Sequence, residues 1–236
     1  MSWQSRTELL LGKEKLDKLA SASVLVVGLG GVGAYAAEMI VRAGVGCMTI
    51  VDGDVLRESN INRQLMALNS TIGKNKTGLL GERLLDINPA LRLNMITEFI
   101  KDERMIEILE MGFDYVVDAI DTLSPKVFLI YHSIHKGIPL VSSMGAGGKI
   151  DPSKIEITDI SKTYNCNLAR VLRKRLHKLG IRKGFTAVFS PEEVPGESIE
   201  PVEGEQNKKS TVGTISYMPP AFGCACASVV IRGLIY

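Results

Sequence analysis

The sequence predicts an α/β protein built on an open, doubly wound and mostly parallel sheet. Three observations predict this class. Short apolar runs rich in β-branched residues recur through the first 150 residues, as expected of strands covered on both faces. Helix-forming segments separate these runs, and a glycine-rich turn, GLGGVG, links the first run to the first helix. Strands and helices that alternate in this way require crossover connections, and therefore parallel pairing.

The elements of this first part can be assigned in chain order. The predicted strands are 24–27, 48–51, 115–118 and 139–142, and the predicted helices are 34–43 and 126–136. The first helix is rich in alanine and stops at Gly44, a residue type that commonly ends helices. The second strand stops at Asp52, which places a carboxylate at the edge of the sheet.

After about residue 150 the sequence pattern changes. Polar and apolar residues alternate over 154–158, which indicates antiparallel strands. Leucines spaced three or four apart over 168–179 predict a helix with a basic outer face. The segment 190–210 is rich in proline, glycine and glutamate, so we expect a mobile loop. Residues 219–235 are small and apolar and predict a helix packed on the sheet.

This change of pattern bears on domain organisation. We expect a single domain over 1–236, in which 1–150 forms a nucleotide-binding half and 151–236 forms a smaller, partly antiparallel half that faces the substrate. A chain of this length is within the range of one hydrophobic core.

Composition excludes several functional classes. The 28 basic and 26 acidic residues give a net charge of +2, so an overall basic coat for nucleic acid is absent. The first fifteen residues are polar and do not resemble a signal peptide, and the apolar tail over 222–236 contains Arg232 and is too short to span a bilayer. We therefore expect a soluble cytoplasmic protein with no membrane partner.

Cysteines and histidines do not form a recognisable site. The four cysteines, Cys47, Cys166, Cys224 and Cys226, include no CxxC pair, which argues against structural zinc and against a disulfide framework. Cys166 is expected to have no catalytic role, and the other three are expected to be buried packing residues. The histidines, at 132, 135 and 177, lack metal-ligand spacing.

The glycine-rich turn predicts a nucleotide site. Gly28, Gly30 and Gly33 allow a tight turn and close approach of a phosphate to the N-terminus of the following helix. Asp52, at the end of the second strand, is placed to accept hydrogen bonds from ribose hydroxyls. NAD and FAD enzymes use the same arrangement, so these residues indicate a nucleotide and leave the reaction open.

Cations and a carboxylate beyond this turn favour ATP over NAD. Arg63 and Lys76 are suited to neutralise a polyphosphate and departing pyrophosphate, for which a hydride-transfer enzyme has no need. Asp121 follows a strand at the carboxyl edge of the sheet, where one carboxylate suits Mg²⁺ held mainly by phosphate and water. Arg63 and Lys76 taken singly are also typical of solvated surface charges, and Asp118 is expected to be an internal hydrogen-bonding residue.

The motifs together resemble the adenylating domain of the ubiquitin-activating, ThiF/MoeB-type superfamily. They are Gly28-x-Gly30-Gly31-x-Gly33, Asp52-x-Asp54, Ser59-Asn60-x-Asn62-Arg63-Gln64, Gly73-x-x-Lys76 and Asp118-x-x-Asp121. The resemblance implies adenylation of a carboxylate with ATP and Mg²⁺. It implies that Gly28, Gly30, Gly31, Gly33, Asp52, Asp54, Asn60 and Gln64 bind the nucleotide and that Arg63, Lys76, Asp121 and Arg6 are catalytic. Arg6 would be donated across a homodimer.

The second half of the chain resembles the tRNA threonylcarbamoyladenosine dehydratases. The segments that carry this resemblance are 143–152, 159–163, 168–173 and 213–219. It implies ATP-dependent cyclisation of the threonylcarbamoyl group, with tRNA as the partner. Seven of the fourteen residues from Arg170 to Lys183 are basic and would suit RNA phosphates, although a solvated helix face explains them equally well. A sulfur-transfer protein partner and a bound monovalent cation remain open.

Three other functions compete with this interpretation. The first is an adenylyltransferase for the C-terminal glycine of a ubiquitin-like sulfur carrier, against which the missing zinc cysteines argue. The second is a nucleotide-binding module without turnover, and the intact set of Arg63, Lys76 and Asp121 tells against it. An NAD-dependent oxidoreductase is the most distant alternative.

Overall fold

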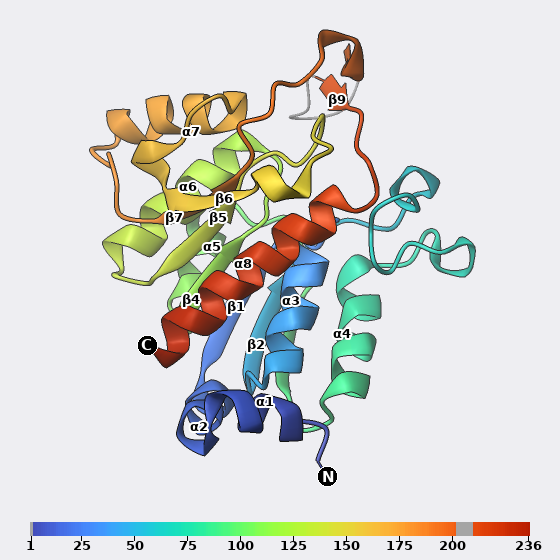
Figure 1. Cartoon of the computed structure of the whole chain (residues 1–236), viewed down its shortest axis with the longest axis vertical. Helices are drawn as coiled ribbons and strands as arrows, with labels where there is room; N and C mark the ends of the chain where they lie inside the picture. The colour runs from blue at the N-terminus through green and yellow to red at the C-terminus, as the bar shows by residue number, and fades with distance from the viewer. Residues whose placement is uncertain (1, 202–209) are drawn as a thin grey trace.

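A seven-stranded sheet forms the centre of the protein. The computed structural model in Figure 1 describes residues 2–201 and 210–236. The strands are β1 (Ser23–Val27), β2 (Cys47–Val51), β3 (Arg92–Ile96), β4 (Tyr115–Asp118), β5 (Leu140–Ser143), β6 (Glu156–Asp159) and β7 (Thr186–Phe189). Their order in the sheet is β3-β2-β1-β4-β5-β7-β6, and every pairing is parallel except that of β6 with β7. The predicted mostly parallel α/β fold is confirmed.

The order in which strands are added to the sheet changes at β1. Strands β2 and β3 extend the sheet on one side of β1, and β4 and β5 extend it on the other. Val27 at the end of β1 is in register with Val51 of β2 on one side and with Asp118 of β4 on the other. The carboxyl ends of these three strands therefore lie next to one another. In open α/β sheets, ligands bind at such a switch point.

Helices cover both faces of the sheet. They are α1 (Ser5–Leu11), α2 (Lys13–Ser21), α3 (Gly33–Ala43), α4 (Lys76–Ile87), α5 (Asp102–Leu109), α6 (Leu123–His135), α7 (Asn167–Lys178) and α8 (Met218–Ile235). One core contains side chains of α3, α4 and α8 with Val24 and Val26 of β1, and the other contains α5, α6 and α7 with Leu25 and Val27. Successive strand residues point to opposite faces, so β1 contributes to both cores.

Helix α8 returns the end of the chain to the first half of the fold. It packs along α3 (Figure 1), and Gly223 permits this contact because a Cβ there would lie 2.5 Å from the carbonyl oxygen of Val32. By length and composition α8 is apolar enough to cross a membrane, which corrects the prediction that the tail is too short. Half of the helix is buried inside the protein, where its apolar side chains belong to the core that also contains α3.

The C-terminal half adds antiparallel structure in two places. Strand β6 pairs antiparallel with β7 at the edge of the main sheet, and β8 (Ile199–Pro201) pairs with β9 (Ser210–Val212) in a separate hairpin. The segment predicted as a mobile loop over 190–210 thus contains a strand of this hairpin and, at Gly196–Ser198, a 3₁₀ turn. Its part over 202–209 lies outside the described residues.

Candidate active site

The glycine-rich turn lies at the switch point and needs its glycines for identifiable reasons. Gly28 has φ +87°, and a Cβ there would lie 2.7 Å from the carbonyl oxygen of Ala119 after β4. A Cβ on Gly33 would lie 1.8 Å from the carbonyl oxygen of Gly28, so only glycine lets α3 start this close to β1. At Gly30 the nearest atom to an added Cβ is 3.8 Å away, which leaves the surface of the turn open.

The N-terminus of α3 points out of this turn. Val32 precedes the helix, and no hydrogen bond from a side chain among the described residues caps its first turn. The first backbone N–H groups of a helix lack intrahelical partners, and the helix dipole favours an anion beside them. The arrangement suits a phosphate group.

Asp52, Asp54 and Lys76 come together at the end of β2. The Asp52 carboxylate accepts hydrogen bonds from the N–H groups of Leu29, at 2.6 Å, and Asp54, at 2.8 Å. Lys76 Nζ lies 2.9 Å from Asp54 Oδ2 and 3.7 Å from Asp52 Oδ2. Burial raises the pKa of Asp52 above its ordinary value, and the Lys76 ammonium and the two N–H groups oppose that shift. Lys76 is itself buried, at the first position of α4.

Arg63 reaches the site from the loop after β2. Its guanidinium donates to the carbonyl oxygen of Ser59 at 2.9 Å and to Asn62 Oδ1 at 2.8 Å. Burial lowers the pKa of Arg63, while the carboxylate of Asp121 acts in the opposite direction. The half-buried guanidinium and Asp121 are therefore within electrostatic reach of each other.

Two amide side chains beside Arg63 behave differently. Asn60 Oδ1 accepts a hydrogen bond from the N–H of Arg57 at 3.0 Å and so stabilises the loop. Gln64 is buried next to Gly30, and its Oε1 has no hydrogen-bond partner among the described residues. A buried amide oxygen without a partner costs free energy, so the Gln64 position is suited to a donor from a bound molecule.

A buried network fixes the turn after β4. Asp118 Oδ2 lies 2.9 Å from Lys126 Nζ and accepts a hydrogen bond from Ser142 Oγ at 2.6 Å. Lys126 also donates to the carbonyl oxygen of Ile120 at 3.0 Å, and the Ile120 N–H donates to Asp118 Oδ1 at 3.2 Å. Asp118 is therefore an internal residue, as predicted. The sequence analysis missed Lys126, which has no exposed surface.

Asp121 is the carboxylate left open at this turn. It is exposed, whereas Asp118 is fully engaged with Lys126 and Ser142. Among residues 2–201 and 210–236, no group of three or more histidine, cysteine, aspartate or glutamate side chains is arranged to hold a metal ion. One free carboxylate fits Mg²⁺ that takes its other ligands from phosphate and water.

Arg6 is not brought to this site within one chain. It is exposed on α1, and α1 lies beside the far end of α3, where Gln4 approaches Gly44 (Figure 1). Helix α3 has 11 residues. At about 1.5 Å per residue, its length separates Arg6 from the glycine-rich turn.

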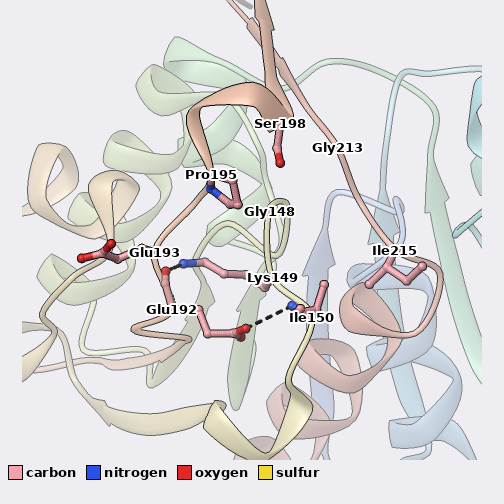
Figure 2. Close-up of a pocket in the computed structure, with 9 residues that line it drawn as sticks. All are labelled: Gly148, Lys149, Ile150, Glu192, Glu193, Pro195, Ser198, Gly213 and Ile215. Atoms are coloured by element: carbon pink, nitrogen blue, oxygen red, sulfur yellow. Dashed lines mark hydrogen bonds between the residues drawn. The ribbon is translucent and has the colours of Figure 1, made fainter.

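A cavity of about 290 Å³ lies between the loop after β5 and the segment that follows β7. Figure 2 shows Lys149 and Ile150 on one wall and Glu192 and Pro195 on another. The segment 213–217 closes a third side, with Ile215 lining the cavity.

Hydrogen bonds hold the segment 213–217 both to the cavity wall and to the Arg63 loop. The Tyr217 hydroxyl donates to the carbonyl oxygen of Ile150 at 2.8 Å. Asn62 Nδ2 donates to the carbonyl oxygen of Thr214 at 2.9 Å. The cavity and the Arg63 loop thus share one wall.

The basic helix and the cysteines refine the sequence predictions. Arg173 donates to the carbonyl oxygen of Thr163 at 2.8 Å, so it fastens α7 to the preceding turn, whereas Lys174 and Lys178 are exposed. Cys166 and Cys226 are buried, and burial raises the pKa of the Cys226 thiol to about 12. The prediction that Cys224 and Cys47 are buried was wrong: Cys224 is exposed and Cys47 is half-buried. Cys47 is the first residue of β2, and Cys224 lies within α8 on its exposed side.

Comparison with known proteins decides the family. The model of the ThiF family matches residues 4–235. The chain belongs to the ThiF family. The matched range contains the glycine-rich turn, the Arg63 loop and the turn before Asp121.

Similar ThiF-family proteins include tRNA-modifying enzymes. The chain is 42% identical over 231 residues to the tRNA threonylcarbamoyladenosine dehydratase of Bacillus subtilis, covering 98% of this chain and 90% of that protein. The E. coli tRNA N6-threonylcarbamoyladenosine dehydratase, TcdA, solved in complex with ATP, matches with a TM-score of 0.89 and 34% identity over 98% of this chain and 94% of that one. TcdA has also been solved in complex with AMP, and that structure matches with a TM-score of 0.88.

Proposed function

We propose that this protein is an ATP-dependent dehydratase that cyclises threonylcarbamoyladenosine in tRNA. The observation that carries the proposal is the near full-length similarity to the Bacillus subtilis dehydratase. The open phosphate-binding turn, with Arg63 and Lys76 beside it, supports an ATP-dependent reaction on this chain.

The proposed reaction has two steps. A carboxylate oxygen of the threonyl group attacks the α-phosphorus of ATP, the bond to the β-phosphate oxygen breaks, and pyrophosphate leaves. A nucleophilic atom of the same side group then attacks the activated carbonyl carbon, loses its proton and displaces AMP. The substrate loses one water in total. An internal nucleophile has a high effective concentration, so the chain needs no nucleophile of its own.

Different residues at the switch point would bind different parts of ATP. The proposal assigns the phosphates to the turn formed by Gly28, Gly30, Gly31 and Gly33, with Asn60, Gln64, Arg63 and Lys76 around it. Asp52 and Asp54 would hold the ribose, and Lys76 already contacts both carboxylates. Arg63 and Lys76 would stabilise the negative charge that develops on pyrophosphate as it leaves.

Mg²⁺ belongs to the same proposal. Asp121 would be its one protein ligand, beside Arg63, and the ion would neutralise phosphate charge. Asp121 is close enough to Arg63 to raise the pKa of the guanidinium against the lowering by burial, which supports this placement. A monovalent cation is a further candidate ligand of the site.

A homodimer would complete the site through Arg6. Trp3, Leu9 and Leu10 are 50%, 89% and 82% exposed on or beside α1. Large apolar side chains exposed next to one another are typical of an interface. We propose that α1 packs against a second copy of the chain and delivers Arg6 to the partner's phosphates.

The division of the chain follows from these roles. Residues 1–150 would bind ATP and residues 151–236 would face the tRNA, with the exposed cations Arg170, Lys174 and Lys178 as candidates for phosphate contacts. A sulfur-transfer protein is a further candidate partner, because a relative named adenylyltransferase and sulfurtransferase in Aspergillus niger is 35% identical over 133 residues. We place the protein in the cytoplasm.

Mass spectrometry of tRNA nucleosides tests the proposal. Purified protein is incubated with ATP, Mg²⁺ and tRNA that contains threonylcarbamoyladenosine. We expect the nucleoside to lose the mass of one water while ATP is converted to AMP and pyrophosphate, and we expect no change without ATP. Pyrophosphate exchange that depends on a diglycine-ended carrier protein and not on tRNA would instead establish the sulfur-carrier alternative.

A further inference from the structure

Three lysines are buried at the carboxyl edge of the sheet, and one of them lacks a bonded carboxylate. Lys126 pairs with Asp118 at 2.9 Å, and Lys76 pairs with Asp54 at 2.9 Å. Lys149 is only 3% exposed, and the acceptor that its ammonium contacts in the described structure is the backbone carbonyl oxygen of Glu192 (Figure 2).

The Glu192 carboxylate is near Lys149 but is engaged elsewhere. Its Oε1 accepts hydrogen bonds from the N–H groups of Ile150, at 3.2 Å, and Asp151, at 3.1 Å. Its Oε2 accepts from Ser190 Oγ at 2.9 Å. Glu192 therefore shapes the wall of the cavity and leaves Lys149 without a direct ion pair.

Such a lysine is poorly satisfied. An ammonium group has three N–H donors, and a buried charge is stable only when it is paired and hydrogen-bonded. Burial lowers the pKa of Lys149, against the influence of Cys166 and Glu192. A buried cation with unused donors is a binding group for an anion that enters from outside.

The cavity beside Lys149 is connected to the Arg63 loop through the segment 213–217. Ile215 lines the cavity, and the neighbouring residue Thr214 accepts the hydrogen bond from Asn62 at 2.9 Å. Asn62 in turn accepts a hydrogen bond from Arg63 at 2.8 Å. The volume of about 290 Å³ is at the lower end of ligand cavities and suits a small side group.

We propose that Lys149 binds the carboxylate of the threonylcarbamoyl group and holds it in this cavity for attack on the α-phosphate. This inference rests on the proposed function. The unused N–H donors of Lys149 would bind the carboxylate while Glu192 keeps the other. Attack on phosphorus then releases pyrophosphate and turns the carboxylate into the mixed anhydride of an acyl-adenylate, which no longer carries the carboxylate charge, so Lys149 holds the substrate more strongly than the adenylate. Lys149 would therefore contribute mainly to substrate binding, and its removal should raise KM more than it lowers kcat.

The test compares Lys149→Met with Lys149→Arg and with Lys154→Met, which removes an exposed lysine near the same cavity. We expect Lys149→Met to raise KM for tRNA containing threonylcarbamoyladenosine between about 10- and 100-fold, because hydrogen bonds to charged groups are lost. The change in kcat should be smaller. Lys149→Arg should recover part of the affinity, and Lys154→Met should resemble the wild type.

Two further measurements separate binding of the carboxylate from other roles. Affinity for the same tRNA without the modification should be equal in the wild type and Lys149→Met, because the carboxylate is absent from both complexes. The melting temperature of Lys149→Met should equal or exceed that of the wild type, since an apolar residue replaces a buried charge without a bonded counter-ion.

Several outcomes would overturn the inference. Equal losses of affinity for modified and unmodified tRNA would mean that Lys149 binds an RNA phosphate. A lower melting temperature would make Lys149 a structural residue, and an unchanged KM would remove it from the substrate site. If the wild-type protein removed no water from the modified nucleoside, the proposed function itself would fail, and the inference with it.

Discussion

Lys126 and Lys149 lie at the same edge of the sheet, and their surroundings differ. Lys126 has a carboxylate, Asp118, at 2.9 Å and a backbone carbonyl at 3.0 Å, and both members of the ion pair are fully buried. Lys149 has a backbone carbonyl and a cavity. Burial alone therefore does not mark a functional lysine. The two lysines differ in their partners: the ion pair of Lys126 holds a turn, whereas Lys149 has no bonded carboxylate, and we infer that it is available to a ligand.

Lys76 gives the largest expected effect and tests the limits of this comparison. It is buried and paired, like Lys126, yet its carboxylates lie at the nucleotide turn. We expect Lys76→Ala, and equally Arg63→Ala, to lower kcat at least about 10³-fold, because cations directed at phosphates contribute this much. AMP release measures it, and Lys74→Ala, at an exposed position, is the matched control. Activity close to wild type would remove Lys76 from the phosphate site.

Lys126 should show its effect in stability. Lys126→Met leaves Asp118 buried without its cation, which is expected to lower the free energy of unfolding by about 3–5 kcal/mol. Urea denaturation measures the change. Lys136→Met removes a lysine from a surface pair with Glu110 and should cost less than about 1 kcal/mol. Equal values for the two variants would mean that the buried pair contributes no more than a surface pair.

Gly148 tests whether the cavity wall requires the backbone at residue 148 to pack closely against Val194. Gly148 has φ +71°, and a Cβ there would lie 2.4 Å from Val194 Cγ1. Gly137 has φ +69° with no atom within 4 Å of an added Cβ. We expect Gly137→Ala to cost about 1 kcal/mol of unfolding free energy from backbone strain, and Gly148→Ala about 2–3 kcal/mol, because overpacking adds to it. Urea denaturation of the two variants measures the difference in their free energies of unfolding. Equal losses in the two variants would show that Val194 moves aside without cost.

The pH dependence of stability gives the smallest expected effect. Burial lowers the pKa of Lys149 in the folded state, while an unfolded lysine titrates near about 10.4. Between these two values the unfolded chain binds more protons, so folding stability rises with pH. The unfolding free energy of the wild type minus that of Lys149→Met should therefore increase as pH is raised toward 10. Urea titrations at several pH values measure it, and a decrease would contradict the assigned direction.

Sequence patterns predicted the switch point because its strands are buried on both faces. Strands β1, β2 and β4 read as continuous apolar runs, and the glycine-rich turn is encoded by adjacent residues. Strand β3, RLNMI, escaped prediction because it is an edge strand with mostly exposed or half-buried side chains. Its polar composition is typical of a loop.

The predicted candidate site residues came from local motifs, whereas the missed ones depend on tertiary contacts. Lys126 and Lys149 look like surface lysines in the sequence, since nothing nearby in the chain indicates that Asp118 or Glu192 will lie beside them. Glu192 is 43 positions from Lys149. Cys224 and Cys226 share one apolar segment, yet their burial differs because they project from different sides of α8.

The segment 213–217 has a thermodynamic consequence. Thr214 is bonded to Asn62 on the nucleotide side, and Tyr217 is bonded to Ile150 at the cavity. We expect a shift of this segment on binding at one side to change the affinity for a ligand at the other side. Linkage requires this influence to be mutual: the factor by which a ligand at the nucleotide turn changes the affinity of the cavity is the factor by which a ligand in the cavity changes the affinity of the turn.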